Sequence, residues 1–320
     1  MRLLFATFQS PLHPAGPYAR AIERLWWVFF AITAVIYVLM LIGFALAVRK
    51  GARRKQADLS DEATRSGARF ITIALSATTV ILIGLLFTSI ATGRDISPVD
   101  DKVTREIKIT GHQWWWEVQY AEARPDMIVE TANELHLPVG ERVKLILDSD
   151  DVIHSLWIPN LHGKRDLIPG YDGVLTLTAD KTGTYRAQCA EFCGLQHAKM
   201  AFLVIVEPKA DFERWLTAQR LPAPFPKTAD QQHGQQVFLT STCVMCHAIK
   251  GTSAGARTGP DLTHLASRRT LGAGILPNTL GNLHGWIANA QTIKPGVLMP
   301  PNPLEPNDLH ALVAYLETLQ

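Results

Sequence analysis

The sequence predicts a multidomain membrane protein in which a transmembrane helical hairpin precedes an all-β sandwich and an all-α domain. Two long uncharged apolar runs predict the hairpin, period-two alternation predicts the sandwich, and helical periodicity near the end predicts the last domain. The 320 residues leave room for about two domains with cores of their own. A net charge of +2 predicts no strong attraction to nucleic acid, so no such partner is expected.

The expected hairpin covers residues 22–94 and follows a short N-terminal extramembrane segment, residues 1–21. Its spans, residues 25–48 and 70–92, carry no charge and are long enough to cross a hydrocarbon core of about 30 Å. Tyr18, Trp26 and Trp27 suit an interfacial belt at the start of the first span. A buried hairpin in a soluble protein is the alternative, but soluble helices rarely run so long without a polar face.

The loop between the spans, residues 49–69, is rich in Lys and Arg. By the positive-inside rule it is cytoplasmic, so both termini lie on the other face. We therefore expect a multi-pass protein of the bacterial cytoplasmic membrane, with its C-terminal domains on the periplasmic or outer face. Residues 1–10 contain too short an apolar stretch for a convincing signal peptide, so the first span is expected to direct insertion.

The all-β domain is expected over residues 95–208. Alternating runs broken by Gly, Pro and Asp predict a β-sandwich here, the clearest being residues 105–111, 143–148, 174–180 and 201–208. A linker follows over residues 209–230, with a short helix and then a stiff, Pro-rich connector. These features separate the sandwich from the last domain.

The all-α domain is expected over residues 231–320. Its clearest helix lies at the end, where Leu309, Leu312, Val313 and Leu316 share one face and Asn307 can cap the start. The chain shows no repeat at solenoid spacing, so two unlike domains are predicted rather than an array.

The last domain contains the motif C-x-x-C-H, formed by Cys243, Cys246 and His247. Two cysteines at this spacing can form thioethers to both vinyl groups of a haem, and the adjacent histidine then binds the iron. A zinc half-site or a redox pair is the alternative, but zinc would need a second ligand pair and no other cysteine lies nearby. The motif therefore predicts a covalent haem c.

The sixth ligand of that haem is expected to be Met299, the one methionine after the motif, which lies in a Pro-rich loop. Methionine and histidine together raise the reduction potential and suit electron transfer. His264, His284 and His310 are the competing candidates, although such histidines more often lie at the surface or in packing.

A second cluster of soft donors lies late in the sandwich. Cys189, Cys193, His197 and Met200 lie close together between two predicted strands, and His154 can reach them from a neighbouring loop. Sulfur and imidazole donors favour copper over hard cations, and two metals bridged by the thiolates would use the whole set. The alternatives are a strained disulfide between the two cysteines and a zinc site with His197.

Both domains resemble known families. The sequences CVMCH, GPDL, PGVLMPP and LVAYLETL resemble a class I cytochrome c domain, in which Gly234, Phe238 and Tyr315 would lie where the N- and C-terminal helices cross. The motif C-x-E-x-C-G-x-x-H-x-x-M, the upstream H-S-x-x-I-P and GHQWWWEV closely resemble subunit II of haem-copper cytochrome c oxidases. The combination is most similar to the caa-type oxidases.

The second resemblance implies a cupredoxin fold with a binuclear copper A centre. It implies that Cys189 and Cys193 bridge the coppers, that His154 and His197 each bind one, and that Met200 and the Glu191 carbonyl are further ligands.

The resemblance also implies roles beyond the copper ligands. The Glu191 carboxylate would reach a magnesium ion at the interface with subunit I, supported by Asp166. Trp114 would be the point where electrons enter. Residues 114–116 are expected on one strand, with Trp114 and Trp116 on one face and Trp115 on the other.

The expected function is that of subunit II of a terminal respiratory oxidase. An external donor, which is a cytochrome c, a cytochrome bc complex or a small copper protein, reduces the haem c. Electrons then pass through copper A to subunit I, where dioxygen is reduced to water. Membrane lipid and other oxidase subunits are the remaining partners. The equivalent subunit of a nitric oxide reductase and a membrane-anchored copper-delivery protein are the alternatives, while a quinol oxidase subunit would lack the copper ligands.

Overall fold

The computed structural model describes residues 9–51, 61–97, 103–122 and 124–320, which form two compact units. One unit is Arg20–Ser97, and the other contains the rest of the described chain. The first eight residues of the expected extramembrane segment and the centre of the expected cytoplasmic loop, residues 52–60, lie outside the described residues.

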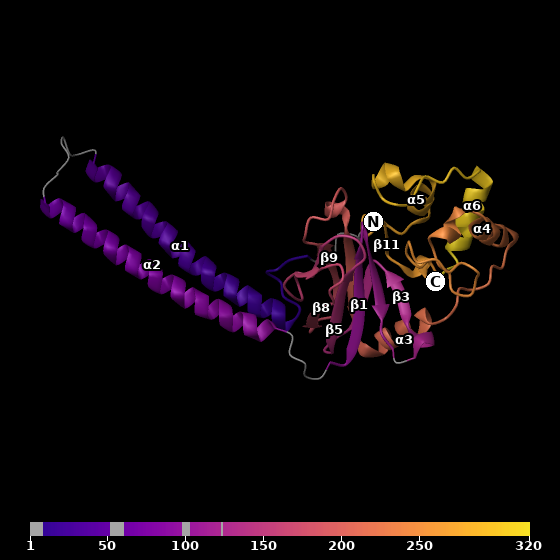
Figure 1. The fold of residues 1–320 in the computed structure, drawn as a ribbon, viewed down its shortest axis with the longest axis horizontal. Coiled ribbons are helices and arrows are strands. Elements are labelled where there is room, and N and C mark those ends of the chain that lie inside the picture. Colours follow the sequence, from indigo (N-terminus) through magenta and orange to yellow (C-terminus); the bar gives the residue numbers. More distant parts are fainter. Residues whose placement is uncertain (1–8, 52–60, 98–102, 123) are drawn as a thin grey trace. The chain divides into compact units, whose positions relative to one another are not determined.

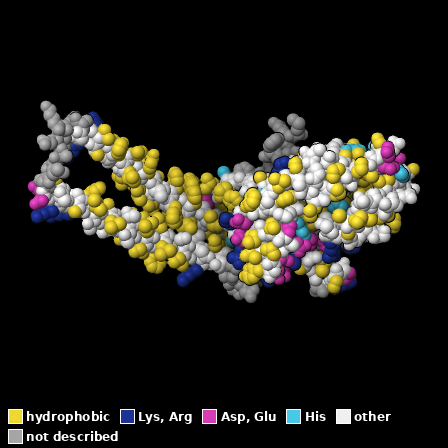
Figure 2. All heavy atoms as spheres, turned by 45° about the horizontal axis from the view of Figure 1, so that its top comes forward, with side chains coloured by type: hydrophobic (Ala, Val, Ile, Leu, Met, Phe, Trp, Pro, Cys, Tyr) yellow, Lys and Arg dark blue, Asp and Glu magenta, His cyan; other side chains and the backbone are white. Residues whose placement is uncertain are grey.

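The smaller unit consists of helices α1 (Pro17–Gly51, whose first residues belong to the larger unit) and α2 (Asp61–Ile96). Both are long and apolar enough to cross a membrane. Hydrophobic side chains cover much of the surface of these helices (Figure 2), as expected for contact with lipid. Each helix is longer than its apolar run because helical structure continues into the charged flanks.

The sandwich comprises two five-stranded sheets, ordered β3-β2-β1-β5-β8 and β4-β10-β9-β6-β7. All four alternating runs form strands of these sheets, which confirms the β-sandwich (Figure 1). The strands are β1 (Arg105–His112), β2 (Trp115–Tyr120), β3 (Val129–Ala132), β4 (Glu134–Pro138), β5 (Arg142–Ser149), β6 (His154–Trp157), β7 (Arg165–Leu167), β8 (Gly173–Thr178), β9 (Gly183–Cys189) and β10 (Ala201–Glu207).

Alternate residues of the strands face a closed apolar core, with Ile107, Ile109 and Trp116 fully buried. Helix α3 (Lys209–Gln219) covers one end of this core and buries Phe212 and Leu216 there. The sandwich is therefore a complete hydrophobic unit on which surface loops can be held rigidly.

An N-terminal strap, residues 9–16, packs against the outside of the sandwich. The amide of Ala15 donates to the carbonyl of Asn160 at 2.7 Å, and its carbonyl accepts from the amide of Asp180 at 2.7 Å. A Cβ on Gly16 would lie 2.3 Å from the carbonyl oxygen of Thr178, so only glycine fits at this point of contact.

The helical domain contains α4 (Ala229–Thr240), α5 (Leu280–Ile293), α6 (Pro306–Leu316) and the short pair β11 (Thr270–Leu271) and β12 (Leu276–Pro277). Helices α4 and α6 cross closely, because a Cβ on Gly234 would lie 1.9 Å from the Ala311 carbonyl oxygen. Near this crossing, Phe238 and Tyr315 pack with ring centroids 6.5 Å apart.

One predicted helix boundary was wrong. Helix α6 begins at Pro306 with Glu305 as its N-cap, rather than with Asn307 as the cap. Proline is favoured at the first helical position because its fixed φ suits the helix and it lacks an amide hydrogen that would remain unpaired. The apolar face was predicted correctly, since Leu312, Val313 and Leu316 are buried.

Candidate copper and haem sites

The loop between β9 and β10 gathers sulfur and imidazole donors over Cys193. The Cys193 Sγ lies 3.8 Å from the Cys189 Sγ, 3.7 Å from the His197 Nδ1 and 3.8 Å from the Met200 Sδ. A short 3-10 helix, His197–Lys199, turns the chain so that the imidazole and the thioether reach the same thiol. The folded loop therefore brings together the four donors that the spacing suggested.

His154 approaches the same cluster from the first position of β6. Its side chain is fully buried, and its Nδ1 lies 3.9 Å from the Cys189 Sγ. Its Nε2 lies 2.8 Å from the Asp151 carboxylate, which accepts a hydrogen bond from it and leaves the Nδ1 lone pair toward the thiol. The Cys189 Sγ also lies 3.2 Å from the main-chain carbonyl oxygen of Glu191.

The two thiols have opposed ionisation behaviour. The hydrogen bond between the two thiols lowers the pKa of Cys189 well below its usual value, whereas the same hydrogen bond, together with burial, raises the pKa of Cys193. Both cysteines are free, and their 3.8 Å separation is far longer than an S–S bond of about 2.05 Å. Two adjacent thiolates therefore need a cation to be stable together.

Glu191 and Asp166 lie at the surface beside this cluster. The Glu191 residue is exposed although its carbonyl faces inward, so its carboxylate is accessible to a partner. Asp166 is exposed on β7 and is paired with Ser155, the residue after His154.

The three consecutive tryptophans do not share one strand, so the predicted alternation was wrong for the first of them. Trp114 lies in the two-residue turn between β1 and β2, because the chain reverses at residues 113–114 to form the hairpin. Trp115 and Trp116 begin β2 and face opposite sides, with Trp116 fully buried. The Trp114 Nε1 donates to the Cys193 carbonyl at 3.0 Å, so this indole contacts the loop between β9 and β10 directly.

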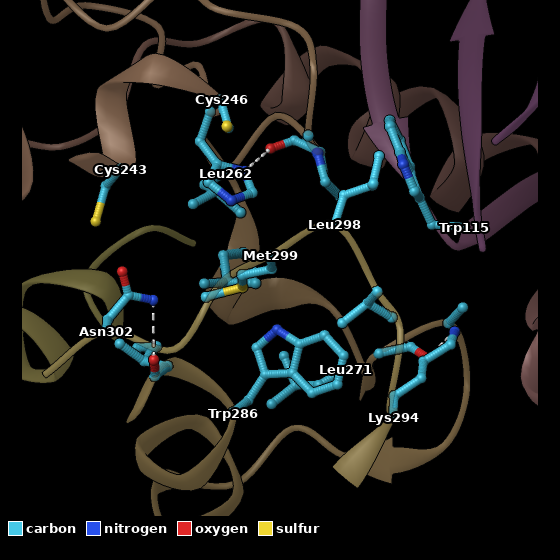
Figure 3. Close-up of a pocket in the computed structure, with 18 of the residues that line it drawn as sticks. Trp115, Cys243, Cys246, Leu262, Leu271, Trp286, Lys294, Leu298, Met299 and Asn302 are labelled. Carbon is cyan, nitrogen blue, oxygen red and sulfur yellow. Dashed lines mark hydrogen bonds between the residues drawn. The ribbon is translucent and has the colours of Figure 1, made fainter. Parts of the chain in front are cut away.

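A cavity of about 420 Å³ occupies the helical domain and extends to the sandwich. Cys243, Cys246, His247 and Met299 line it, together with Trp114 and Trp115 from the sandwich. Figure 3 shows Cys243 and Cys246 on one side, Met299 near the centre, and Trp115 and Lys294 on the side away from Cys243. The cavity volume lies within the range of about 300–1,000 Å³ that is common for cofactor pockets.

His247 is held in the protonation state that metal binding requires. Its Nδ1 lies 2.7 Å from the Pro260 carbonyl oxygen, which can only accept, so Nδ1 carries the hydrogen and Nε2 keeps its lone pair. Burial lowers the pKa of His247, which keeps the imidazole neutral. A Cβ on Gly259 would lie 2.7 Å from the His247 Cε1, so this glycine leaves room for the ring.

The competing histidines do not line the cavity. His264 lies with both ring nitrogens near main-chain carbonyls, the Nδ1 at 2.7 Å from Gln320 O and the Nε2 at 3.1 Å from Gln219 O. The rings of His284 and His310 stack on each other with centroids 6.2 Å apart.

Sequence reasoning missed several residues around both sites. Arg268 and Thr270 line the cavity and are buried, yet Arg268 Nε and Thr270 Oγ1 have no hydrogen-bond partner among the residues that the structure describes. A Cβ on Gly111 would lie 2.8 Å from the His154 Cδ2. Gly111 could have been found from sequence only through the motif GHQWWWEV, which it begins. No local pattern marks Arg268 or Thr270.

The comparisons with known proteins match both extramembrane domains. The family described as "Cytochrome C oxidase subunit II, periplasmic domain" matches residues 105–207, and the family described as "Cytochrome c" matches residues 231–320. A crystal structure of the periplasmic domain of subunit II of cytochrome oxidase from Bradyrhizobium japonicum is 28% identical, with a TM-score of 0.36, and the match covers 38% of this chain and 97% of that one.

Two curated relatives match almost the whole chain. The cytochrome c oxidase subunit 2 of Bacillus subtilis is 27% identical over 98% of this chain and 92% of its own length. That of Alkalihalophilus pseudofirmus is 32% identical over 97% of this chain and 91% of its own length. Since similarity of this extent spans the hairpin, the sandwich and the helical domain together, the chain belongs to the cytochrome c oxidase subunit 2 family.

Proposed function

We propose that this chain accepts electrons from an external donor at a covalent haem c and delivers them, through a binuclear copper A centre, to subunit I. Dioxygen would be reduced to water in that partner. The observation that carries the proposal is that His154, His197 and Met200 all approach the adjacent thiols of Cys189 and Cys193. The same compact unit also contains the cavity lined by the C-x-x-C-H motif.

The donor set of the sandwich fits two copper ions. We assign Cys189 and Cys193 as bridging thiolates and His154 and His197 as one imidazole for each metal, with Met200 and the Glu191 carbonyl as weaker ligands. Three of these residues, His154, Cys189 and Cys193, already lie with their ligand atoms within 4.8 Å of one another. When bound at these residues, a copper pair would accept and release one electron with little rearrangement of its ligands.

The cavity of the helical domain fits a haem. Cys243 and Cys246 would hold the porphyrin by thioethers, and His247 and Met299 would be the axial ligands, a pair that raises the reduction potential. Arg268 donates through its Nη2 to the Asp261 carbonyl, but its Nε finds no acceptor among the described residues. A haem propionate beside this buried guanidinium would supply that acceptor.

Trp114 is the residue that we propose as the connection between the two sites. It lines the haem cavity, and its Nε1 donates to the carbonyl of Cys193, a proposed copper ligand. Gln113 donates to the same carbonyl at 2.7 Å, which fixes the turn that carries the indole. The turn thus holds an aromatic ring that lines the cavity on one side and contacts the β9–β10 loop on the other. We call this loop, residues 190–200, the copper loop.

The chain is membrane-anchored by its two N-terminal helices and carries a periplasmic subunit II domain. We propose that the exposed Glu191 carboxylate binds magnesium at the interface with subunit I, and that Asp166 supports that contact. The exposure of both side chains and their position beside the copper ligands favour this assignment. The external donor and the surrounding lipid are the remaining proposed partners.

Copper electron spin resonance of the purified full chain tests the proposal. The expected signal shows an unpaired spin divided evenly between two copper nuclei, accompanied by the absorption of a covalent haem. A signal from a single copper nucleus, or a protein that holds only zinc, would overturn it.

A further inference from the structure

The segment that precedes Met299 contacts the copper loop of the sandwich. The Gln196 Nε2 donates to the Pro295 carbonyl at 2.6 Å, and the Lys199 Nζ donates to the Ile293 carbonyl at 3.1 Å. These two side chains flank His197, the proposed copper ligand, in sequence. The loop that would supply the sixth haem ligand is therefore attached to the loop that would supply copper ligands.

Glycine allows the same segment to approach closely. Gly296 has a φ of +87°, and a Cβ there would lie 2.9 Å from the Leu195 Cδ2 and 3.8 Å from the Trp114 ring. A residue with a side chain would be strained by the positive φ, so glycine suits this close approach.

Lys294 lies at the centre of this contact and is almost completely buried, with 1% of its surface exposed. Its Nζ donates to the Trp114 carbonyl at 2.7 Å and to the Gly272 carbonyl at 3.0 Å. One acceptor belongs to the sandwich and the other to the helical domain. Within the part of the chain that the structure describes, no carboxylate forms an ion pair with this lysine.

Burying a lysine without a carboxylate is costly, and the stem alone could be replaced by an apolar side chain. The side chain is therefore placed for its nitrogen, which hydrogen-bonds to both domains at once. Of the two acceptors, the Trp114 carbonyl is on the residue that also donates to the copper loop. The Lys294 Nζ thus connects the loop before Met299 to Trp114, the residue that we propose as the connection between the two redox sites.

We propose that Lys294 is the positioning residue that docks the haem domain on the copper domain, with Trp114 held between them. This proposal rests on the proposed function, because docking matters for activity only if electrons pass from the haem domain to the copper domain. Lys294 itself touches neither set of proposed metal ligands in the contacts described, so it acts through the position of the Met299 segment and of the Trp114 turn.

The test is a Lys294→Met substitution in the full chain, which keeps the apolar stem and removes the hydrogen bonds. Hydrogen exchange of the amides at positions 293, 294 and 296, and at 195–199, reports docking without any reference to the cofactors. The substitution leaves the buried carbonyls of Trp114 and Gly272 without this donor, which destabilises the docked arrangement. Hydrogen exchange at both segments is therefore expected to become about tenfold faster or more. In the loaded protein, flash-initiated electron transfer from haem to copper is expected to slow by a similar factor, while both absorption spectra stay unchanged.

Matched variants separate docking from general damage. Lys144→Met removes a partly exposed lysine on β5 that pairs with Glu106, and is expected to leave exchange at both segments unchanged. Lys294→Ala, supplemented with propylamine, is expected to recover slow exchange, because a free amine can occupy the vacated space and reach both carbonyls.

Unchanged exchange in a folded Lys294→Met chain would overturn the proposal, even if copper and haem load normally and the proposed function stands. Loss of the two-copper signal in the unmodified chain would instead overturn the proposed function and leave the docking result valid. If Lys294→Met does not fold, Gln196→Met tests the same segment, because it removes the hydrogen bond to Pro295. Unchanged exchange in that variant would equally count against docking through this segment.

Discussion

A methyl group added at Gly111 is expected to displace a proposed copper ligand. The Cβ of alanine there would lie 2.8 Å from the His154 Cδ2 and 3.0 Å from its Cγ. Carbon atoms in contact prefer separations of at least about 3.5 Å, so the imidazole would have to retreat by about 0.7 Å. Metal sites hold their ligands within about 0.2 Å of the preferred distances, so this displacement exceeds what the site tolerates.

The strand that carries Gly111 cannot relieve the clash by moving. Strand β1 is paired with β2 on one side, where Gly111 faces Trp116, and with β5 on the other, where it faces Ser149. The displacement therefore falls on His154. We expect the Gly111→Ala chain to lose the evenly shared two-copper signal and to be destabilised by about 1–3 kcal/mol through overpacking.

The assay is copper stoichiometry together with electron spin resonance on the purified full chain, with thermal unfolding as a check of the fold. Gly281→Ala is the matched control, because a Cβ there meets no atom within 4 Å and the residue lies in helix α5. A folded Gly111→Ala chain that holds two coppers with an unaltered resonance would refute the reasoning.

Three further changes have defined outcomes. Met299→Ala should keep the haem attached but lower its midpoint potential in a redox titration, since a thioether ligand raises that potential; an equal potential would exclude Met299 as a ligand. Gly234→Ala should destabilise the helical domain by about 3 kcal/mol in thermal unfolding, because its Cβ would lie 1.9 Å from a carbonyl oxygen of α6; an unchanged melting temperature would contradict this packing. Burial lowers the pKa of His136, but its ion pair with Glu134 and its hydrogen bond to Glu207 raise that pKa above 6.5 overall. The stability that these contacts add is present below pH 6.5 and is lost as pH rises through the raised pKa, so Glu207→Gln should flatten the pH dependence of stability in urea unfolding.

The proposed copper donors could be predicted largely from sequence because most of them lie close together in the chain. Cys189, Cys193, His197 and Met200 lie on one loop, so the fold needs only to close that loop to bring them together. His154 is distant in sequence, and it was predicted as a second imidazole because it follows a strand in a neighbouring loop; only the resemblance to a known family assigned it to one of two metals. The alternating strands were equally local, since one buried face determines their pattern.

The remaining features depend on long-range packing that periodicity does not encode. The position of Trp114 required knowing that the chain reverses at that residue, and three consecutive tryptophans gave no sign of a turn. Lys294 looks like an ordinary surface lysine in the sequence, yet it is buried because another domain covers it. The capping error at α6 arose because Asn307 is a good cap by composition while Pro306 fits one position earlier.

The N-terminal strap fixes the parity of the membrane crossings. Ala15 hydrogen-bonds to Asn160 and Asp180, so the residues just before α1 and the sandwich occupy the same compartment. A chain that begins and ends on one side must traverse the bilayer an even number of times between those points. Deleting either α1 or α2 alone would leave one crossing, so the strap and the sandwich would lie in different compartments and could not contact each other.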